Sequence, residues 1–255
     1  MHLDVVQLRD FYHGPLGRAV ARHIGRRLRL IWPDVRGLNL LGLGYAMPYL
    51  GPLARRGEAE RVIAMMAASQ GVHRWNPPGG MRASRRGNLA TITEENAFPL
   101  PDGSMDRVLL VHMLETSDRP RALLREAWRV LAPGGKMIAI VPNRTGLWSL
   151  LSERSPFGHG RPYSRNQLEA SLTEHMFTPT QHATALFAPP FKGRMGVRLV
   201  MGTEELGAKW WPRFGGVHII EAEKLIYACG PRPPVRVVKP VPIQTSPALR
   251  RTNKP

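Results

Sequence analysis

Short apolar runs recur through the middle of the chain, separated by turn residues or by a helical pattern. Five of these runs have the length and composition of buried strands, at residues 38–43, 61–66, 89–93, 107–111 and 137–141. Between the last two, residues 120–131 place their apolar side chains on one helix face, and the Pro-Gly-Gly at 133–135 then ends the helix. A strand, a helix and a strand in this order form the unit of a parallel sheet, so the pattern predicts an α/β fold.

Amphipathic and turn-rich segments flank these runs on both sides. Residues 16–31 place five arginines between apolar positions at helical spacing. This predicts a basic amphipathic helix that either packs with a solvated arginine face or contacts RNA or a membrane. The remaining predicted elements are helices at 45–55 and 164–175, a partly helical segment at 195–211, and strands at 178–188 and 217–227. The expected division is a basic helical region (1–36), a main domain (37–229) and a disordered, proline-rich basic tail (230–255).

Composition narrows the class of protein. The 255 residues are 43% apolar, which is enough for a globular core. No apolar run approaches the length of a membrane span, and the first residues lack the apolar core of a secretory signal. The single cysteine, Cys229, excludes an intramolecular disulfide and a cysteine-based zinc site, and we predict no metal site. A cytoplasmic protein is therefore expected.

The net charge of +17 bears on the choice of partner. Such an excess of arginine and lysine favours anionic partners, either RNA or a lipid surface. The same charge is also found on the solvated surface of proteins that are simply arginine-rich. No aromatic-rich RNA-binding signature or helix-turn-helix pattern accompanies it, so the charge alone does not decide between these interpretations.

The segment 94–143 carries a more specific pattern. It contains Phe98-Pro99-Leu100, a turn at 101–104, Met105-Asp106 before an apolar strand, then His112, Leu114 and Glu115, and finally Arg-Val-Leu-Ala-Pro-Gly-Gly at 129–135. This combination resembles the class I S-adenosylmethionine-dependent methyltransferases, specifically the large bacterial group called type 11. The resemblance implies a Rossmann-like, seven-stranded sheet with helices on both faces. Its last strand is antiparallel, and residues 217–227 stand where that strand belongs.

The resemblance also assigns a cofactor site at the carboxyl ends of the central strands. It gives the first glycine loop to Gly42, Gly44 and Tyr45, the ribose side to Gln70, the adenine side to Glu94 and the adjacent Glu95, and the surroundings of the methyl group to His112. A neutral imidazole at His112 is the candidate catalytic base. His159 and Tyr163, in the loop after the fifth strand, are expected to border the substrate entrance.

Two cofactor-binding motifs of that family are altered in this sequence. Its first motif has an acid and three glycines, but Leu40 stands at the acid position and Ala46 at the third glycine. The second strand ends without the acid that would bind the ribose. Each lost hydrogen bond to a charged acceptor is worth about 1.5–3 kcal/mol, so these changes lower the expected affinity for the cofactor.

Two functions therefore remain. The first is an S-adenosylmethionine-dependent methyltransferase that acts on an unidentified oxygen, nitrogen or carbon nucleophile, with RNA as one possible acceptor. The alternative is a catalytically degenerate protein of the same fold that binds or stabilises another protein, with the Trp210-Trp211 pair and the tail as candidate contacts. A nicotinamide-dependent dehydrogenase is disfavoured, because Met47 stands at the third glycine position of its fingerprint.

Overall fold

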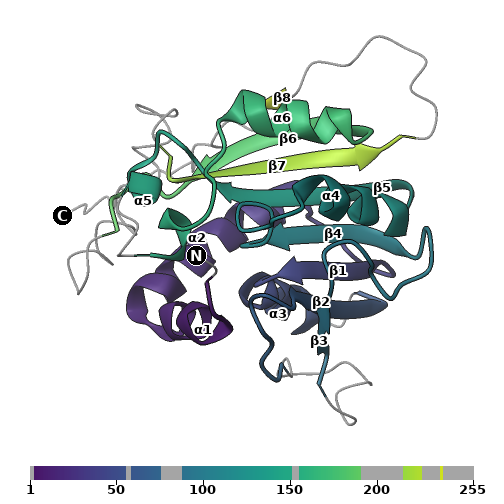
Figure 1. Cartoon of the computed structure of the whole chain (residues 1–255), viewed down its shortest axis with the longest axis horizontal. Helices are drawn as coiled ribbons and strands as arrows, with labels where there is room; N and C mark the ends of the chain where they lie inside the picture. Colours follow the sequence, from purple (N-terminus) through teal and green to yellow (C-terminus); the bar gives the residue numbers. More distant parts are fainter. Residues whose placement is uncertain are drawn as a thin grey trace, which may run out of the picture.

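One mixed sheet with helices on both faces forms the body of the protein (Figure 1). The computed structural model describes residues 3–55, 59–75, 88–150, 155–190, 215–225 and 236–237. The helices are α1 (Val5–His13), α2 (Pro15–Ile31), α3 (Met47–Arg55), α4 (Pro120–Val130), α5 (Leu147–Leu150) and α6 (Arg165–Glu174), with a 3-10 turn, η3, at Pro156–Gly158. The strands are β1 (Asn39–Gly44), β2 (Arg61–Ala67), β3 (Ala90–Thr93), β4 (Met105–Val111), β5 (Leu131–Pro142), β6 (Phe177–Ala185), β7 (Val217–Lys224) and β8 (Arg236–Val237).

The strand order is β3-β2-β1-β4-β5-β7-β6-β8. Strands β1 to β5 pair in parallel, and β7 runs antiparallel to both of its neighbours, β5 and β6. The predicted α/β sheet with an antiparallel last strand is thus confirmed for seven strands, and the two-residue β8 extends it. The chain reverses its direction of progress between β1 and β4, which is where open parallel sheets bind ligands at the carboxyl ends of their strands.

The Pro-Gly-Gly turn at 133–135 lies inside a strand instead of before it. Met105 of β4 pairs with Leu131, whereas Arg107 pairs with Lys136, so the extra residues of β5 form a bulge between these two pairs. Gly134 takes a positive φ of 71° in this bulge. The prediction that the helix ends at this point holds, since α4 stops at Val130.

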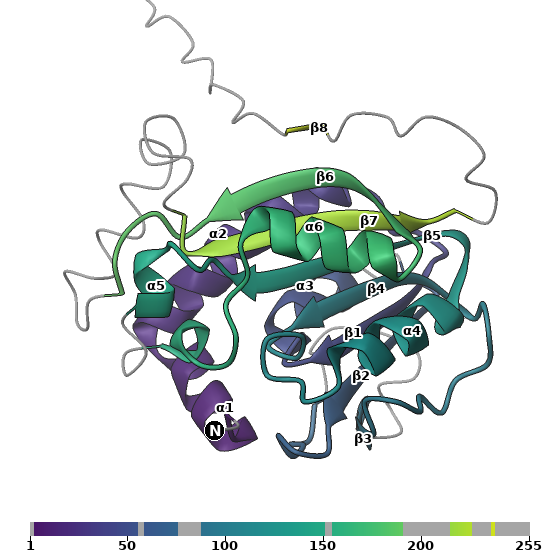
Figure 2. The same ribbon diagram turned by 45° about the horizontal axis from the view of Figure 1, so that its top comes forward.

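The two faces of the sheet are covered by different helices (Figures 1 and 2). Helices α2 and α3 pack on one face, and α4 and α6 pack on the other. The predicted basic helix is α2, whose Val20, Ile24 and Leu28 are buried while its arginines face outward. At its end, the indole N–H of Trp32 donates to Oε1 of the buried Glu221 in β7, at 2.9 Å.

Helix α1 was not predicted from the sequence. Asp4 caps it by accepting a hydrogen bond from the Val6 N–H, and Leu8 and Tyr12 are buried. The Val5 N–H donates to the Gln70 carbonyl just beyond β2, at 2.9 Å. Helix α1 therefore lies at the carboxyl edge of the sheet, as Figure 2 shows.

Several predictions fall on residues that the structure does not describe. They are the partly helical segment at 195–211, with the Trp210-Trp211 pair, and the tail from 230 except for β8. Within the described ranges, no helix is long and apolar enough to cross a membrane.

Candidate active site

The segment before β4 is held by one arginine of α4. The Arg129 guanidinium donates to the carbonyls of Phe98 and Leu100, at 3.0 and 2.9 Å, and to both carboxylate oxygens of Glu126. Glu126 in turn accepts from the Phe98 N–H at 2.8 Å. The Arg129 hydrogen bonds keep the pKa of Glu126 below its usual range. The two halves of the sequence signature are thus physically joined, because the loop before β4 and the end of α4 form one hydrogen-bonded unit.

The turn after β1 packs directly on β4. Gly44 has a φ of 72°, and a Cβ at this position would overlap the carbonyl oxygen of Val111. The next residue, Tyr45, donates its N–H to that same carbonyl at 2.8 Å. Gly42 has a different role, since a Cβ there would overlap the side chain of Leu50 in α3. Of the two glycines predicted to cradle a cofactor, Gly44 thus forms the turn and Gly42 makes room for a helix.

Tyr45 lies flat against the first helix. Its ring stacks on Tyr12 with centroids 5.4 Å apart, and only 2% of the residue is exposed. Its hydroxyl lies 3.3 Å from Nε2 of His73, and burial raises its pKa to about 12. The Ala46 N–H donates to the Gly44 carbonyl. The backbone donors of Tyr45 and Ala46 are therefore used within the protein.

His112 is the centre of a buried polar chain at the end of β4. Its Nε2 lies 2.9 Å from the Tyr12 hydroxyl, which is also 2.9 Å from the Tyr49 hydroxyl. Its Nδ1 lies 3.2 Å from Oε1 of Glu115. All contacts are satisfied when Nδ1–H donates to Glu115, Tyr12 donates to Nε2 and Tyr49 donates to Tyr12. Burial raises the pKa of both tyrosines, so they remain donors at neutral pH.

The backbone at His112 is also unusual. Its φ is 53°, a left-handed conformation that non-glycine residues seldom adopt, and the side chain is completely buried. Such backbone strain persists only where the surroundings fix it, and it often accompanies a functional site. The ring of Phe157, from η3, lies 4.5 Å from the imidazole and fixes it from another side.

Gln70 occupies the position predicted for a ribose contact. It is 2% exposed, and its Nε2 donates to the His112 carbonyl and to Thr116 Oγ1. Its Oε1 is buried without a hydrogen-bond partner, and the same is true of Oε2 of Glu115. Buried acceptors are rarely left unpaired. Two acceptors at the ends of β2 and β4 fit a ligand that offers hydroxyl donors, as the ribose of a nucleoside does.

The two predicted adenine contacts differ in their surroundings. Glu94 is exposed just after β3 and its backbone pairs with Ala97. The Glu95 carboxylate accepts from the Ser117 hydroxyl and from the Arg119 N–H, so it braces the start of α4. Of the two carboxylates, only Glu94 is exposed enough to meet a ligand without breaking these bonds.

The predicted substrate loop lies against the same site. The Arg161 N–H donates to the Glu115 carbonyl at 2.7 Å, and Gly160 packs so closely on that carbonyl that a Cβ would overlap it. Tyr163 is half-buried, and burial together with the nearby Glu115 raises its pKa. His159 is half-buried in the loop, where its N–H donates to the Pro156 carbonyl. The structure therefore brings the loop of Tyr163 to the His112–Glu115 pair.

Sequence reasoning did not find Tyr12 or Tyr49, which complete the polar chain. The spacing of Val5, Leu8 and Tyr12 is that of a helix face and carried a usable signal for α1. No sequence pattern indicated that this helix would reach His112. Among the residues that the structure describes, no group of three or more histidine, cysteine or acidic side chains is arranged to hold a metal ion.

Comparisons with known proteins bear on the fold. Residues 41–139 match the family model described as a methyltransferase domain. A search of curated proteins finds no match. Among solved structures, a methyltransferase from Thermotoga maritima described as a possible histamine N-methyltransferase is 17% identical. The alignment covers 86% of this chain and 95% of that one, with a TM-score of 0.59.

Two further solved structures share the fold. One is the putative methyltransferase of Haloferax volcanii in complex with the Trm112 activator, at 15% identity, 86% and 98% coverage and a TM-score of 0.52. The other is the [4+2]-cyclase SpnF, at 17% identity, 80% and 81% coverage and a TM-score of 0.52. Identities this low establish the fold and leave the reaction open. Residues 41–139 thus resemble a methyltransferase domain, and the solved structures show that the chain has the fold of S-adenosylmethionine-dependent methyltransferases.

Proposed function

We propose that this protein is an S-adenosylmethionine-dependent methyltransferase whose cofactor site lies at the carboxyl edge of the sheet. Helix α1 covers this site and withdraws when the cofactor binds. The observation that carries the proposal is the pair of buried, unpartnered acceptors, Gln70 Oε1 and Glu115 Oε2, at the sheet's reversal point. Leaving a buried acceptor unpaired costs about 1–3 kcal/mol. A ligand that donates hydrogen bonds to these oxygens recovers that free energy on binding.

The chain offers three groups to such a cofactor. The Gly44 turn lets the chain bend sharply at the end of β1, Gln70 can accept from a ribose hydroxyl, and the exposed Glu94 can accept from the adenine amine. A neutral amide replaces the family's carboxylate at Gln70. Hydrogen bonds to charged groups are worth about 1.5–3 kcal/mol and neutral ones about 1 kcal/mol, so we expect weaker binding than in relatives that keep the acid.

The bound cofactor supplies an electrophilic methyl group, and His112 prepares the acceptor. Glu115 holds the imidazole with its proton on Nδ1, which leaves the Nε2 lone pair as the base. A base is useful for a hydroxyl or amine acceptor that must lose a proton, so this geometry favours oxygen or nitrogen over carbon. Glu115 also stabilises the imidazolium that forms when His112 takes the proton.

Opening is required because α1 occupies these groups in the closed structure. Tyr12 donates to Nε2 of His112 and stacks on Tyr45. A base whose lone pair is already bonded does not accept a proton from substrate. The measured affinity for cofactor then equals the intrinsic affinity reduced by the fraction of molecules in which α1 has withdrawn.

The degenerate, non-methylating alternative also has one specific observation in its favour. The Tyr45 and Ala46 N–H groups, which the glycine loop would present to a ligand, are bonded to Val111 and Gly44. The structure named as a [4+2]-cyclase shows that proteins named for other reactions share this fold. In this alternative, α1 never withdraws, and it permanently covers the carboxyl edge of the sheet as part of the fold.

Calorimetric titration of the full chain with S-adenosylhomocysteine and S-adenosylmethionine tests the proposal. We expect saturable 1:1 binding, and about tenfold weaker binding for Gln70→Ala, which removes one acceptor. The matched control is Ser69→Ala, an exposed neighbour whose loss should leave the affinity unchanged. Absence of heat and of a thermal shift at millimolar ligand would reject the enzyme and favour the non-methylating alternative.

A further inference from the structure

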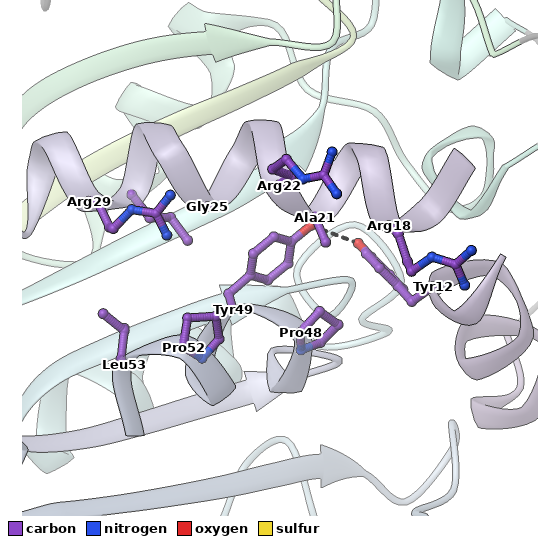
Figure 3. Close-up of a pocket in the computed structure, with 11 residues that line it drawn as sticks. Tyr12, Arg18, Ala21, Arg22, Gly25, Arg29, Pro48, Tyr49, Pro52 and Leu53 are labelled. Atoms are coloured by element: carbon purple, nitrogen blue, oxygen red, sulfur yellow. Dashed lines mark hydrogen bonds between the residues drawn. The ribbon is translucent and has the colours of Figure 1, made fainter. Parts of the chain in front are cut away.

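A groove runs between α2 and α3, with Tyr12 of α1 at one end (Figure 3). Its volume is about 540 Å³, within the range of about 300–1,000 Å³ that is usual for small-molecule sites. The lining comes from α2 (Arg18, Ala21, Arg22, Gly25, Leu28 and Arg29), from α3 (Pro48, Tyr49, Pro52 and Leu53) and from α1 (Tyr12). The groove is therefore built by three helices that the sheet holds in place.

The charge of the lining is of one sign. Arg18, Arg22 and Arg29 of α2 line the groove, and no aspartate or glutamate is among the lining residues. Arg18, at the α1 end, also donates to the His13 carbonyl. The positive charge of α2 also affects the neighbouring His23. Its pKa is lowered by burial and by the charges of Arg26, Arg22 and Arg27. A guanidinium binds phosphate or carboxylate through two parallel hydrogen bonds, so this rim selects an anion.

The rest of the lining is mainly apolar. Leu28, Leu53, Pro48 and Pro52 present hydrocarbon to the groove, and the Tyr12–Tyr49 hydroxyl pair supplies a polar point at one end. A small inorganic anion would accept hydrogen bonds from guanidinium groups and leave this apolar surface in contact with water. A neutral apolar molecule would cover the surface and offer the guanidinium groups no acceptor. Only a molecule with both parts complements the whole lining.

We propose that this groove binds an amphipathic anion, with a phosphate or carboxylate head at the arginines of α2 and an apolar body against the prolines and leucines. The groove adjoins the proposed cofactor site at one end. Ten of its eleven lining residues lie in α2 and α3, and Tyr12 and Tyr49 also belong to the polar chain at His112. The arginines and the apolar residues of the lining lie outside that chain, so binding in the groove can be measured on the protein without cofactor.

Gly25 provides a sharp test because it lies in the groove and has free space around it. A Cβ at Gly25 would meet nothing within 4 Å, so a larger side chain can enter the groove without disturbing the helix. Leucine is also a better helix former than glycine, which favours folding of Gly25→Leu. Gly25→Ala is the matched control, since it gains helix propensity and adds only one methyl group.

The probe is octyl phosphate, kept below its aggregation concentration and titrated by calorimetry into the full chain. We expect saturable 1:1 binding that weakens at least tenfold in Gly25→Leu and about fivefold in Arg29→Gln, while Gly25→Ala binds like the parent chain. Inorganic phosphate and octanol should each bind at least tenfold more weakly than octyl phosphate. Circular dichroism confirms that each variant is folded.

Three outcomes would overturn the proposal. The first is no saturable binding of octyl phosphate. The second is binding that Gly25→Leu and Arg29→Gln leave unchanged, which would place the ligand elsewhere. The third is binding to vesicles of phosphatidylglycerol without binding to monomeric octyl phosphate, which would assign the arginines of α2 to a membrane surface instead of a ligand groove.

Discussion

The hydroxyl of Tyr12 lies 2.9 Å from Nε2 of His112, although 100 positions separate the two residues in the chain. The contact joins the first helix to the end of the fourth strand. The Nε2 lone pair of His112 is therefore available to a substrate only when α1 moves away. If the site is catalytic, the closed structure is therefore an inactive state, and α1 controls access to it.

Tyr12→Phe should favour the open state. The substitution keeps the ring that stacks on Tyr45 but removes the hydrogen bonds to His112 and Tyr49, each worth about 1 kcal/mol. Because the closed state loses these bonds and the open state does not, the affinity for S-adenosylhomocysteine should rise about five- to thirtyfold. Calorimetry with the two proteins measures the difference.

The control for this variant is Val6→Ala, which changes an exposed side chain on the same helix. It should leave the affinity unchanged. Weaker binding by Tyr12→Phe than by the parent chain would mean that Tyr12 contacts the ligand instead of covering its site.

Gly44→Ala should destabilise the fold more than a glycine substitution at another left-handed position. Gly44 and Gly37 both have positive φ, at 72° and 67°. A Cβ at Gly44 would overlap the Val111 carbonyl, whereas a Cβ at Gly37 would meet nothing within 4 Å. Urea unfolding should show a loss of about 1 kcal/mol for Gly37→Ala and at least about 3 kcal/mol for Gly44→Ala. Equal losses would show that β1 and β4 do not approach as closely as described.

Arg129→Lys should cost about 2–3 kcal/mol of unfolding free energy, because lysine keeps the charge and loses the fork that binds Glu126 and two carbonyls. Arg125→Lys, on an exposed position of the same helix, is the matched control and should change little. Denaturant unfolding at neutral pH compares the two. A stable Arg129→Lys protein would indicate that the loop before β4 is held by packing alone.

The fold should lose stability in mild acid through a buried histidine pair. His182 and His218 lie on neighbouring strands with Nε2 and Nδ1 3.1 Å apart, and burial lowers their pKa values to about 3 and about 4. In the unfolded chain both titrate near pH 6.5, so the unfolded state binds more protons as the pH falls below that value. As the pH falls from about 6.5 to 4, the free energy of unfolding should therefore decrease by on the order of 5 kcal/mol because of this pair.

His182→Gln tests this prediction by removing one titrating group of the pair. The slope of unfolding free energy against pH between about 4.5 and 6.5 should fall by about half. His13→Gln, at an exposed position, should leave the slope as it is. An unchanged slope in His182→Gln would assign the acid sensitivity to carboxylates elsewhere.

The fold could be predicted from the sequence because its signals are local. The apolar runs of the central strands, the spacing in α4 and the Ser164 capping box each lie within a few residues, and each formed where predicted. The bulge at Gly134 escaped prediction because it depends on pairing between β4 and β5. Helix α1 escaped although Val5, Leu8 and Tyr12 repeat at helical spacing, because three buried positions make only a short pattern.

The candidate site was predictable only in part, for a similar reason. Gln70 and His112 follow predicted strands, and the family resemblance assigned both to the carboxyl edge of the sheet. The contacts of Tyr12 with His112 and Tyr45 join residues far apart in the chain, and no spacing rule anticipates them. The groove beside α2 depends on the packing of three helices, and the sequence showed only the arginines of its rim.

Hydrogen exchange of the full chain, with and without saturating S-adenosylhomocysteine, tests the central claim most directly. The account predicts that the ligand speeds exchange of the amides in α1 (Val5–His13) and slows exchange around Gly44 and Gln70. Faster exchange in α1 together with protection at the ends of β1 and β2 would establish that the helix withdraws as the cofactor enters. Unchanged or slower exchange in α1 at saturation, or no response at any site, would contradict it.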